Sequence, residues 1–178
     1  MSSNPEQRNN GGQWLDEGEE RAWRSLRMMQ MRLDSALNRQ LMVDSELSLP
    51  DYAVLVSLTD RAEGRQRLFE LAEDIGWERS RLSHHINRMA RRGLVVKEVC
   101  DQDRRGAFVV LTDAGLAAIQ KAAPLHVAAV RRLVTDQLDS SELAIVGNAA
   151  EKILRALDLD AQGSTADGAD GSSGMGCT

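Results

Sequence analysis

Apolar side chains in the first quarter of the chain recur every three or four residues, the spacing that places them on one face of an α-helix. The pattern predicts a long helix from about Glu17 to Val43, with Trp23, Leu33 and Leu41 in its apolar stripe. At about 1.5 Å per residue this helix is roughly 40 Å long. One small domain cannot cover a stripe of that length, so we expect part of it to contact a partner.

A short helix, a tight turn and a second helix are predicted in the middle of the chain. Just before them, Ser48 is placed to cap a helix in which Asp51 is the acid of a capping box. The short helix covers about residues 69–74, Gly76 permits the turn, and the second helix extends from about Glu78 to Arg92. This order is that of a helix-turn-helix, whose second helix enters the major groove in DNA-binding proteins.

The hydrophobic period then changes from helical to strand-like. Leu94–Cys100 and Ala107–Thr112 are apolar, β-branched runs joined by the polar turn 101–106, a pattern that predicts a β-hairpin. Ahead of the helix-turn-helix, residues 63–67 are predicted to form a loop. The elements together indicate a mainly α-helical fold with a small β-hairpin wing.

Two further helices are predicted after the hairpin. One begins at the N-cap Thr112 and extends to about Thr135, and the last opens with a capping box made by Asp139 and Glu142. The segments 1–15 and 161–178 are polar and rich in small residues, so we expect both to be disordered tails.

Charge is distributed unevenly along the chain. The 178 residues carry a formal net charge of −5, which by itself argues against a nucleic-acid partner. Residues 76–106, however, contain eight basic and four acidic side chains, a net charge of +4 that leaves −9 for the rest of the chain. Because salt screens charges over about 10 Å, a local basic surface on an acidic protein can still bind phosphates.

Several classes of protein are disfavoured. No apolar stretch reaches the roughly 18 residues of a membrane span, and the N-terminus lacks the design of a secretory signal, so we expect a cytoplasmic protein with no membrane partner. Cys100 and Cys177 do not make a disulfide framework. The chain has no Gly-rich phosphate loop, no Gly-x-Ser-x-Gly elbow and no metal-hydrolase spacing, so we expect neither an enzyme nor a cofactor.

The helix from Glu78 to Arg92 carries the residues that suit DNA. Leu82, Ile86 and Met89 fall on one side of it, which leaves the polar side chains outward at about 100° per residue. Arginine can bind guanine with two hydrogen bonds, asparagine can bind adenine, and serine or histidine can serve bases or phosphates. The predicted DNA contacts on this helix are Arg79, Ser80, Arg81, Ser83, His84, Asn87, Arg88 and Arg91, with Arg92 at the border of the strip.

The turn of the hairpin adds a second predicted contact. Arg104 and Arg105 lie at its tip, where they could enter the minor groove, whose negative potential attracts arginine. Asp103 is better explained as a brace that orients the guanidinium of Arg105 through a charge-assisted hydrogen bond than as a DNA contact.

Two segments, LAEDIGWERSRLSHHINRMARRGLV and DQDRRGAFVVLTDAG, resemble the MarR (multiple antibiotic resistance regulator) family of winged helix-turn-helix regulators. The most specific part is an Asp-x-Arg turn followed by a strand that ends Leu-Thr-x-x-Gly, matched by Asp103, Arg105, Leu111, Thr112 and Gly115. The resemblance covers about residues 23–157. It implies an obligate homodimer, a wing arginine in the minor groove, a palindromic double-stranded DNA operator, and repression relieved by a small ligand or by oxidation.

The resemblance also implies a division of the chain. Residues 16–160 would form one MarR-like domain, with 48–112 as the DNA-binding lobe and 16–44 and 113–160 as dimerisation helices. Two positions depart from the family pattern: Phe69 stands where many members have a capping Ser or Thr, and Glu78 is a poor cap for the recognition helix.

The signal that controls such a regulator is left open by the sequence. A small organic effector, such as an aromatic acid, is the family-typical choice, and its candidate ligands by type and rough position are Trp23, Arg27, Tyr52 and His126. Trp23 fits equally well as a core residue. Cys100 offers an alternative redox role, and the scattered histidines do not favour a metal site. A winged helix that binds proteins rather than DNA remains the other functional class.

Overall fold

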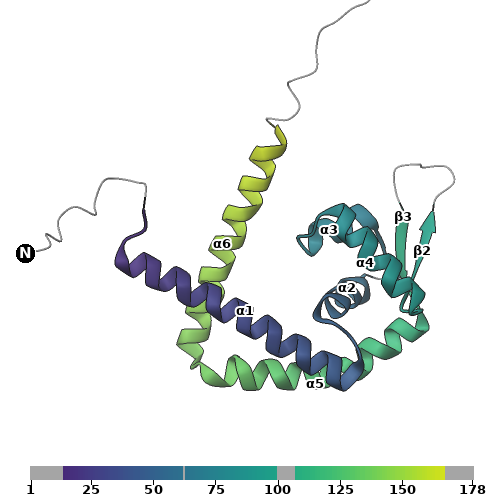
Figure 1. Ribbon diagram of the computed structural model, residues 1–178, viewed down its shortest axis with the longest axis horizontal. Coiled ribbons are helices and arrows are strands. Elements are labelled where there is room, and N and C mark those ends of the chain that lie inside the picture. The colour runs from purple at the N-terminus through teal and green to yellow at the C-terminus, as the bar shows by residue number, and fades with distance from the viewer. Residues whose placement is uncertain (1–13, 62, 100–106, 167–178) are drawn as a thin grey trace, which may run out of the picture. The chain divides into compact units, whose positions relative to one another are not determined.

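The computed structural model describes residues 14–61, 63–99 and 107–166 (Figure 1). The elements in chain order are α1 (Glu17–Ser45), α2 (Leu49–Thr59), β1 (Arg65–Arg67), α3 (Leu68–Asp74), α4 (Arg79–Arg91), β2 (Val95–Val99), β3 (Ala107–Leu111), α5 (Asp113–Leu133), the 3-10 turn η2 (Thr135–Gln137) and α6 (Ser140–Ala166). The chain divides into two compact units, residues 1–130 and 131–178. The first unit therefore holds all the elements from α1 to β3 and most of α5.

Helix starts follow the predicted capping chemistry. At α2, the Ser48 Oγ accepts from the Asp51 N–H at 3.1 Å, and the Asp51 carboxylate accepts from the Ser48 N–H at 2.9 Å. At α6, the Asp139 carboxylate accepts from the Glu142 N–H at 2.9 Å, and the Glu142 carboxylate accepts from the Asp139 N–H, also at 2.9 Å. Both predicted capping boxes are thus confirmed.

The predicted hairpin is one part of a three-stranded antiparallel sheet in the order β1-β3-β2. The loop predicted over residues 63–67 is wrong for Arg65–Arg67, which form β1 and pair with β3. Three polar residues carry no hydrophobic alternation, so their strand pairing depends on β3 rather than on local sequence. Gln66 is buried, and its side chain accepts from Ser57 at 3.2 Å and donates to Asp74 at 2.6 Å.

The core of the first unit joins helices and sheet. Its members are aliphatic side chains from α1, α2, α3, α4, β2, β3 and α5, and they include Leu41, Leu47, Val54, Leu55, Leu58, Leu71, Leu82, Ile86, Met89, Val95, Val109 and Ile119. The helix-turn-helix is packed on this core. Gly76, in its turn, has a φ of 66°, a left-handed conformation that glycine adopts without a steric cost.

The Leu-Thr-x-x-Gly segment joins α5 to the sheet. The Thr112 hydroxyl donates to the carbonyl of Gly93 at 2.6 Å and accepts from the Gly115 N–H at 3.0 Å. A Cβ on Gly115 would lie 2.1 Å from the carbonyl oxygen of Leu94. Glycine at this position therefore allows the first turn of α5 to approach the backbone that leads into β2.

The second unit consists of the end of α5, η2 and α6. α6 continues to Ala166, so the disordered tail predicted from residue 161 begins too early. Ala161 and Gln162 have high helix propensity, which favours continuation of the helix. Residues 1–13 and 167–178 lie outside the described part of the chain. Among the helices that the structure describes, none has the length and apolar character of a membrane span.

Large apolar side chains remain exposed on α1 and α6. On α6 they include Leu143, Val146, Ile153 and Leu157, whose helical spacing places them in one apolar stripe. On the N-terminal half of α1, Trp23, Met28, Met29 and Met31 are all close to half exposed or more. Exposed apolar side chains of this size and number along a helix are typical of a protein interface.

Candidate nucleic-acid interface

The recognition helix α4 has a buried side and an exposed side. Leu82, Ile86 and Met89 are 0% exposed and anchor the helix on the core. The polar side chains of Ser80, His84, Asn87 and Arg91 are exposed, as the helical spacing predicts. Polar groups that can bind bases and phosphates thus lie on one accessible face of a rigid helix.

Two predicted contacts at the start of α4 lie against aromatic rings. The Arg81 guanidinium carbon is 4.3 Å from the ring centroid of Trp77, and that of Arg79 is 5.6 Å from the centroid of Phe69. Arg79 also lies 3.6 Å from the carboxylate of Glu73. Stacking on a ring restricts a guanidinium while its N–H groups stay available for a ligand.

Two other predicted contacts, Ser83 and Arg88, already have partners within the protein. The ammonium of Lys97, on β2, donates to the half-buried Ser83 hydroxyl at 3.4 Å. The Arg88 Nη2 lies 2.9 Å from the Nδ1 of His85. The Ser83 contact joins α4 to β2, whereas the Arg88 contact lies within α4 and holds the guanidinium beside the His85 ring; the sequence pattern indicated neither contact.

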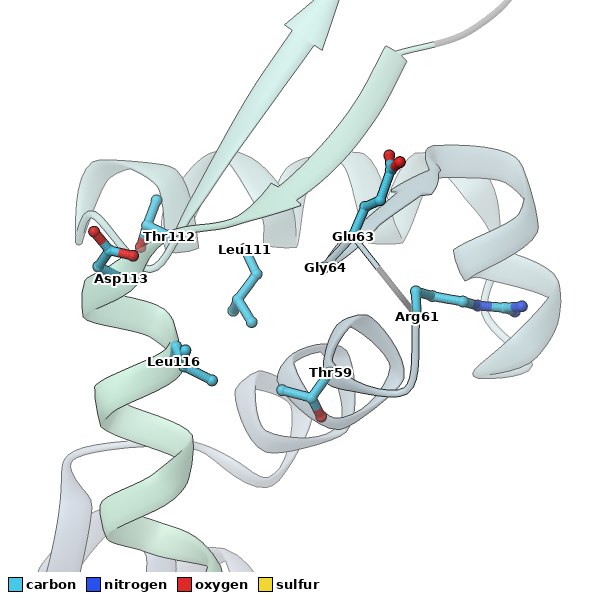
Figure 2. Close-up of a pocket in the computed structure, with 8 residues that line it drawn as sticks. All are labelled: Thr59, Arg61, Glu63, Gly64, Leu111, Thr112, Asp113 and Leu116. Atoms are coloured by element: carbon cyan, nitrogen blue, oxygen red, sulfur yellow. The ribbon is translucent and has the colours of Figure 1, made fainter.

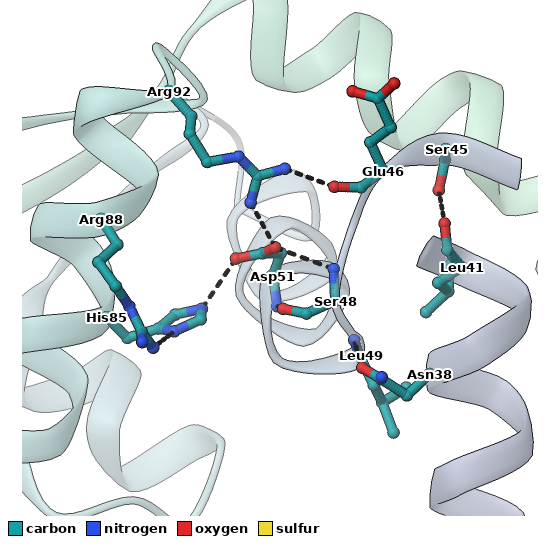
Figure 3. A network of polar contacts seen from close by, with 10 residues as sticks. All are labelled: Asn38, Leu41, Ser45, Glu46, Ser48, Leu49, Asp51, His85, Arg88 and Arg92. Carbon is teal, nitrogen blue, oxygen red and sulfur yellow. Dashed lines mark hydrogen bonds and ion pairs between the residues drawn. The ribbon is translucent and has the colours of Figure 1, made fainter. Parts of the chain in front are cut away.

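A polar cluster beneath α4 is the main feature that the sequence analysis missed (Figure 3). Asp51, 3% exposed, accepts from Arg92 Nη1 at 2.7 Å, and its other oxygen lies 3.0 Å from His85 Nε2. The His85 N–H is poorly aligned with that oxygen, so the contact is electrostatic rather than a well-formed hydrogen bond. Helical spacing offered a signal, because position 85 shares the buried face of Leu82 and Met89.

Burial raises the pKa of the Asp51 carboxyl, but its contacts with His85, the Ser48 N–H and Arg92 outweigh burial and hold the pKa well below its ordinary value. The carboxylate is therefore ionised in the folded protein at neutral pH. A charge that is almost fully buried is unfavourable without partners, so the stability of the fold around Asp51 depends on these contacts.

We expect the stabilisation by Asp51 to disappear in acid. Its folded pKa is depressed, so its contribution to the free energy of unfolding is present above the unfolded pKa of about 4 and is lost as the pH falls below it. In urea unfolding, Asp51→Asn should lower the free energy of unfolding by roughly 2–4 kcal/mol at pH 7 and by less at pH 3.5. Asp34→Asn, at an exposed position of α1, is the control. An Asp51→Asn deficit that is equal at both pH values would contradict the assignment.

The outer face of the sheet carries further basic residues. The guanidinium carbons of Arg65 and Arg67 lie 3.9 Å and 4.7 Å from the ring centroid of Phe108. Arg65 also pairs with Glu98 at 3.0 Å. The turn between β2 and β3, with the predicted contacts Arg104 and Arg105 and the brace Asp103, lies outside the described residues, and so does Cys100.

The four residues predicted to bind the effector fall into two separate pairs. The rings of Tyr52 and His126 contact each other at a tilt of 41° with centroids 4.3 Å apart, and burial raises the pKa of the Tyr52 hydroxyl and lowers that of His126. His126 Nδ1 is 3.3 Å from the side-chain oxygen of Gln40. Trp23 and Arg27 contact each other on α1, but about 25 Å of helix separates Trp23 from Gln40. Within one chain these pairs cannot share a ligand.

A surface pocket of about 290 Å³ lies elsewhere in the first unit (Figure 2). Its lining consists of Thr59, Arg61, Glu63, Gly64, Leu111, Thr112, Asp113 and Leu116, and it includes none of the predicted effector ligands. Arg61 donates to Asp74 at 2.6 Å, and the Thr112 hydroxyl is bonded to Gly93. Two of the polar groups of this pocket are therefore already engaged. Among the described residues no three His, Cys, Asp or Glu side chains cluster as metal ligands.

Solved structures identify the family. The chain is similar to AbsC, a MarR family transcriptional regulator from Streptomyces coelicolor, with 37% sequence identity over 83% of this chain and 99% of that chain and a TM-score of 0.76. The chain belongs to the MarR family. This MarR family member is also similar to Sco3205, a MarR family transcriptional regulator from the same organism, whose structure was solved in complex with DNA. The identity is 36% over 81% of this chain and 94% of the Sco3205 chain, and the TM-score is 0.77.

A more distant structure shares the fold of this MarR family member. BpsR from Bordetella bronchiseptica, whose DNA binding is regulated by 6-hydroxynicotinic acid, is 20% identical over 75% of this chain and 98% of its own, with a TM-score of 0.67. No model of a protein family matches the sequence. The predicted family and the mainly α-helical winged fold are both confirmed, and the chain is a member of a family of transcriptional regulators.

Proposed function

We propose that this protein is a homodimeric repressor that binds a palindromic DNA operator through α4. The observation that carries the proposal is the polarity of that helix, with exposed Ser80, His84, Asn87 and Arg91 opposite three wholly buried anchors. The DNA complex of Sco3205 supports the same role for the shared fold. In this proposal Arg105, braced by Asp103, enters the minor groove beside the site of α4.

The dimer in this proposal is formed by the helices that flank the DNA-binding lobe. The exposed apolar residues of α1 and α6 support it, because a second copy of the chain could cover them. The lobe would comprise residues 48–112, and the segments 16–44 and 113–160 would contribute the interface. Two copies of α4 would then contact half-sites about 34–36 Å apart, one turn of DNA.

A salt titration of duplex binding tests the function. DNA duplexes are selected from a random-sequence pool, and the affinity for the selected duplex and for a scrambled one is measured from 50 to 200 mM salt. A DNA-binding regulator should prefer the selected duplex and lose affinity steeply as salt rises. Absence of duplex binding would instead indicate a protein-interaction module.

Asn87 and His84 should determine sequence preference. Asn87→Ala or His84→Ala is expected to weaken binding to the selected duplex by about tenfold to a hundredfold, because each removes a base contact in the major groove. Binding to the scrambled duplex should change little. Asn148→Ala, at an exposed position of α6, is a control for general effects of substitution. Equal losses on both duplexes would mean that the two side chains touch only phosphate.

The proposed signal is a small organic effector that releases the operator. Tyr52 and His126 support it, because two adjacent aromatic rings offer both apolar ring surface and hydrogen-bonding groups to an aromatic acid. Regulation of BpsR by 6-hydroxynicotinic acid is a precedent within the fold. Trp23 and Arg27 can take part only if the partner subunit brings them near. Screening small aromatic acids for release of the selected duplex, with Tyr52→Phe and His126→Gln as variants, tests this site.

A further inference from the structure

Asp51 lies where three helices meet, and neither the DNA contacts nor the effector site proposed above uses it. It belongs to the first turn of α2, just after the end of α1, and it contacts α4. One carboxylate oxygen accepts from the Ser48 N–H at 2.9 Å and from Arg92 Nη1 at 2.7 Å, and the other lies 3.0 Å from His85 Nε2. A single buried charge therefore joins α2 to two points on α4 (Figure 3).

Arg92 is directed inward although it borders the basic face of α4. Its Nη1 donates to Asp51, and its Nη2 donates to the carbonyl oxygen of Glu46 at 2.5 Å. Glu46 is the residue that ends α1, in a left-handed conformation with φ 58°. The guanidinium thus ties the end of α4 to the corner between α1 and α2, although the side chain remains 42% exposed.

His85 extends these contacts toward the DNA face. A guanidinium can only donate, so the Arg88 Nη2 at 2.9 Å donates to Nδ1, and the proton of a neutral His85 ring lies on Nε2, which faces Asp51. The His85 ring also packs edge-on against Trp77, with centroids 5.4 Å apart and an interplanar angle of 82°. The Trp77 ring also contacts the Arg81 guanidinium, whose carbon lies 4.3 Å from the ring centroid. Two of the predicted DNA contacts, Arg81 and Arg88, therefore depend on the position of His85.

The energetics favour a positioning role over a purely stabilising one. A buried ion pair is often no more stabilising than apolar residues of the same volume, because desolvation offsets the attraction. The hydrogen bonds that Arg92 donates to Asp51 and to the Glu46 carbonyl are directional, by contrast, and fix the orientation of the groups that they join. We propose that Asp51, through His85 and Arg92, is a positioning residue that sets the orientation of α4 for sequence-specific DNA recognition. This inference rests on the DNA-binding function proposed above.

Two adjacent arginines offer a matched test. Arg92→Gln, Arg92→Lys and Arg91→Gln are compared with the wild type for affinity to the selected and the scrambled duplex across the same salt range, with the folded fraction checked by circular dichroism. Arg91→Gln should lower the affinity for both duplexes. It should also reduce the slope of log K against log salt by about 0.9, the value for one phosphate contact. Arg92→Gln should leave the slope and the affinity for the scrambled duplex unchanged, but it should lower the preference for the selected duplex by about tenfold. Arg92→Lys should restore part of this preference, because an ammonium can still reach one acceptor.

A double-variant cycle tests the dependence on Asp51. If Arg92 acts through Asp51, then Asp51→Asn with Arg92→Gln should lose no more preference than the worse single variant. Additive losses, an unchanged preference in Arg92→Gln, or a slope reduced as in Arg91→Gln would each overturn the inference. Because the Arg92 side chain is 42% exposed, its variants remain informative even if Asp51→Asn fails to fold. A wild type that binds neither duplex would overturn the proposed function itself, an outcome distinct from these.

Discussion

Gly115→Ala is expected to lower the free energy of unfolding by about 3 kcal/mol or more. The added Cβ would lie 2.1 Å from the Leu94 carbonyl oxygen and 2.9 Å from a methyl carbon of Leu111. A side chain could move aside, but Leu94 contributes a backbone oxygen at the start of the sheet. Relief of the clash therefore requires α5 to separate from β2, with loss of the hydrogen bond from the Gly115 N–H to Thr112.

Urea and thermal unfolding at one fixed protein concentration measure this effect, because the stability of a dimer depends on concentration. The melting temperature should fall by about 10 °C. Ala117→Ser, two residues further along α5 and exposed, is the matched control and should change the free energy of unfolding by no more than about 0.5 kcal/mol. A Gly115→Ala protein as stable as this control would show that α5 does not pack on the sheet as closely as described.

Charges placed on the apolar stripe of α6 should separate the dimer. Ile153→Asp combined with Leu157→Asp puts two carboxylates on side chains that are 48% and 59% exposed in the single chain and that the proposed interface would bury. Burial of unpaired charges is strongly unfavourable, so we expect a monomer in sedimentation experiments. Affinity for the selected duplex should fall by roughly 10²- to 10⁴-fold, because one α4 would bind without the second.

The control places the same charges on the opposite side of α6. Ser141 and Asn148 are exposed and lie about half a turn from the stripe at 100° per residue. Ser141→Asp with Asn148→Asp should therefore remain dimeric and keep its affinity for the selected duplex. The first unit should stay folded in both double variants, since its core contains no residue of α6. A dimeric Ile153→Asp/Leu157→Asp protein would place the interface elsewhere.

Local chemistry made much of the fold predictable. Ser48 with Asp51 and Asp139 with Glu142 specify helix starts through contacts within four residues, so the sequence defines them directly. The exposed face of α4 is likewise a consequence of helical period, because anchors such as Leu82 must face the core. These elements require no knowledge of distant parts of the chain.

Other features depend on partners far along the chain. β1 is a strand because Gln66 pairs with Val109, more than 40 residues away. Side-chain type alone could not distinguish Arg91 from Arg92, since both are arginines at the end of one basic helix. The direction of each was decided by what lies beneath the helix.

The sequence by itself determined the helix-turn-helix, the hairpin and the face of α4 that meets solvent, because period and capping are local properties, and the resemblance of its motifs indicated the family. The tertiary structure alone decided that the buried Asp51 and His85 and the partly exposed Arg92 form one polar cluster. Asp51 and Arg92 are 41 residues apart, and their contact exists only once α2 and α4 have packed on a common core. A buried charge must find a partner wherever the fold supplies one, and no local pattern names that partner in advance.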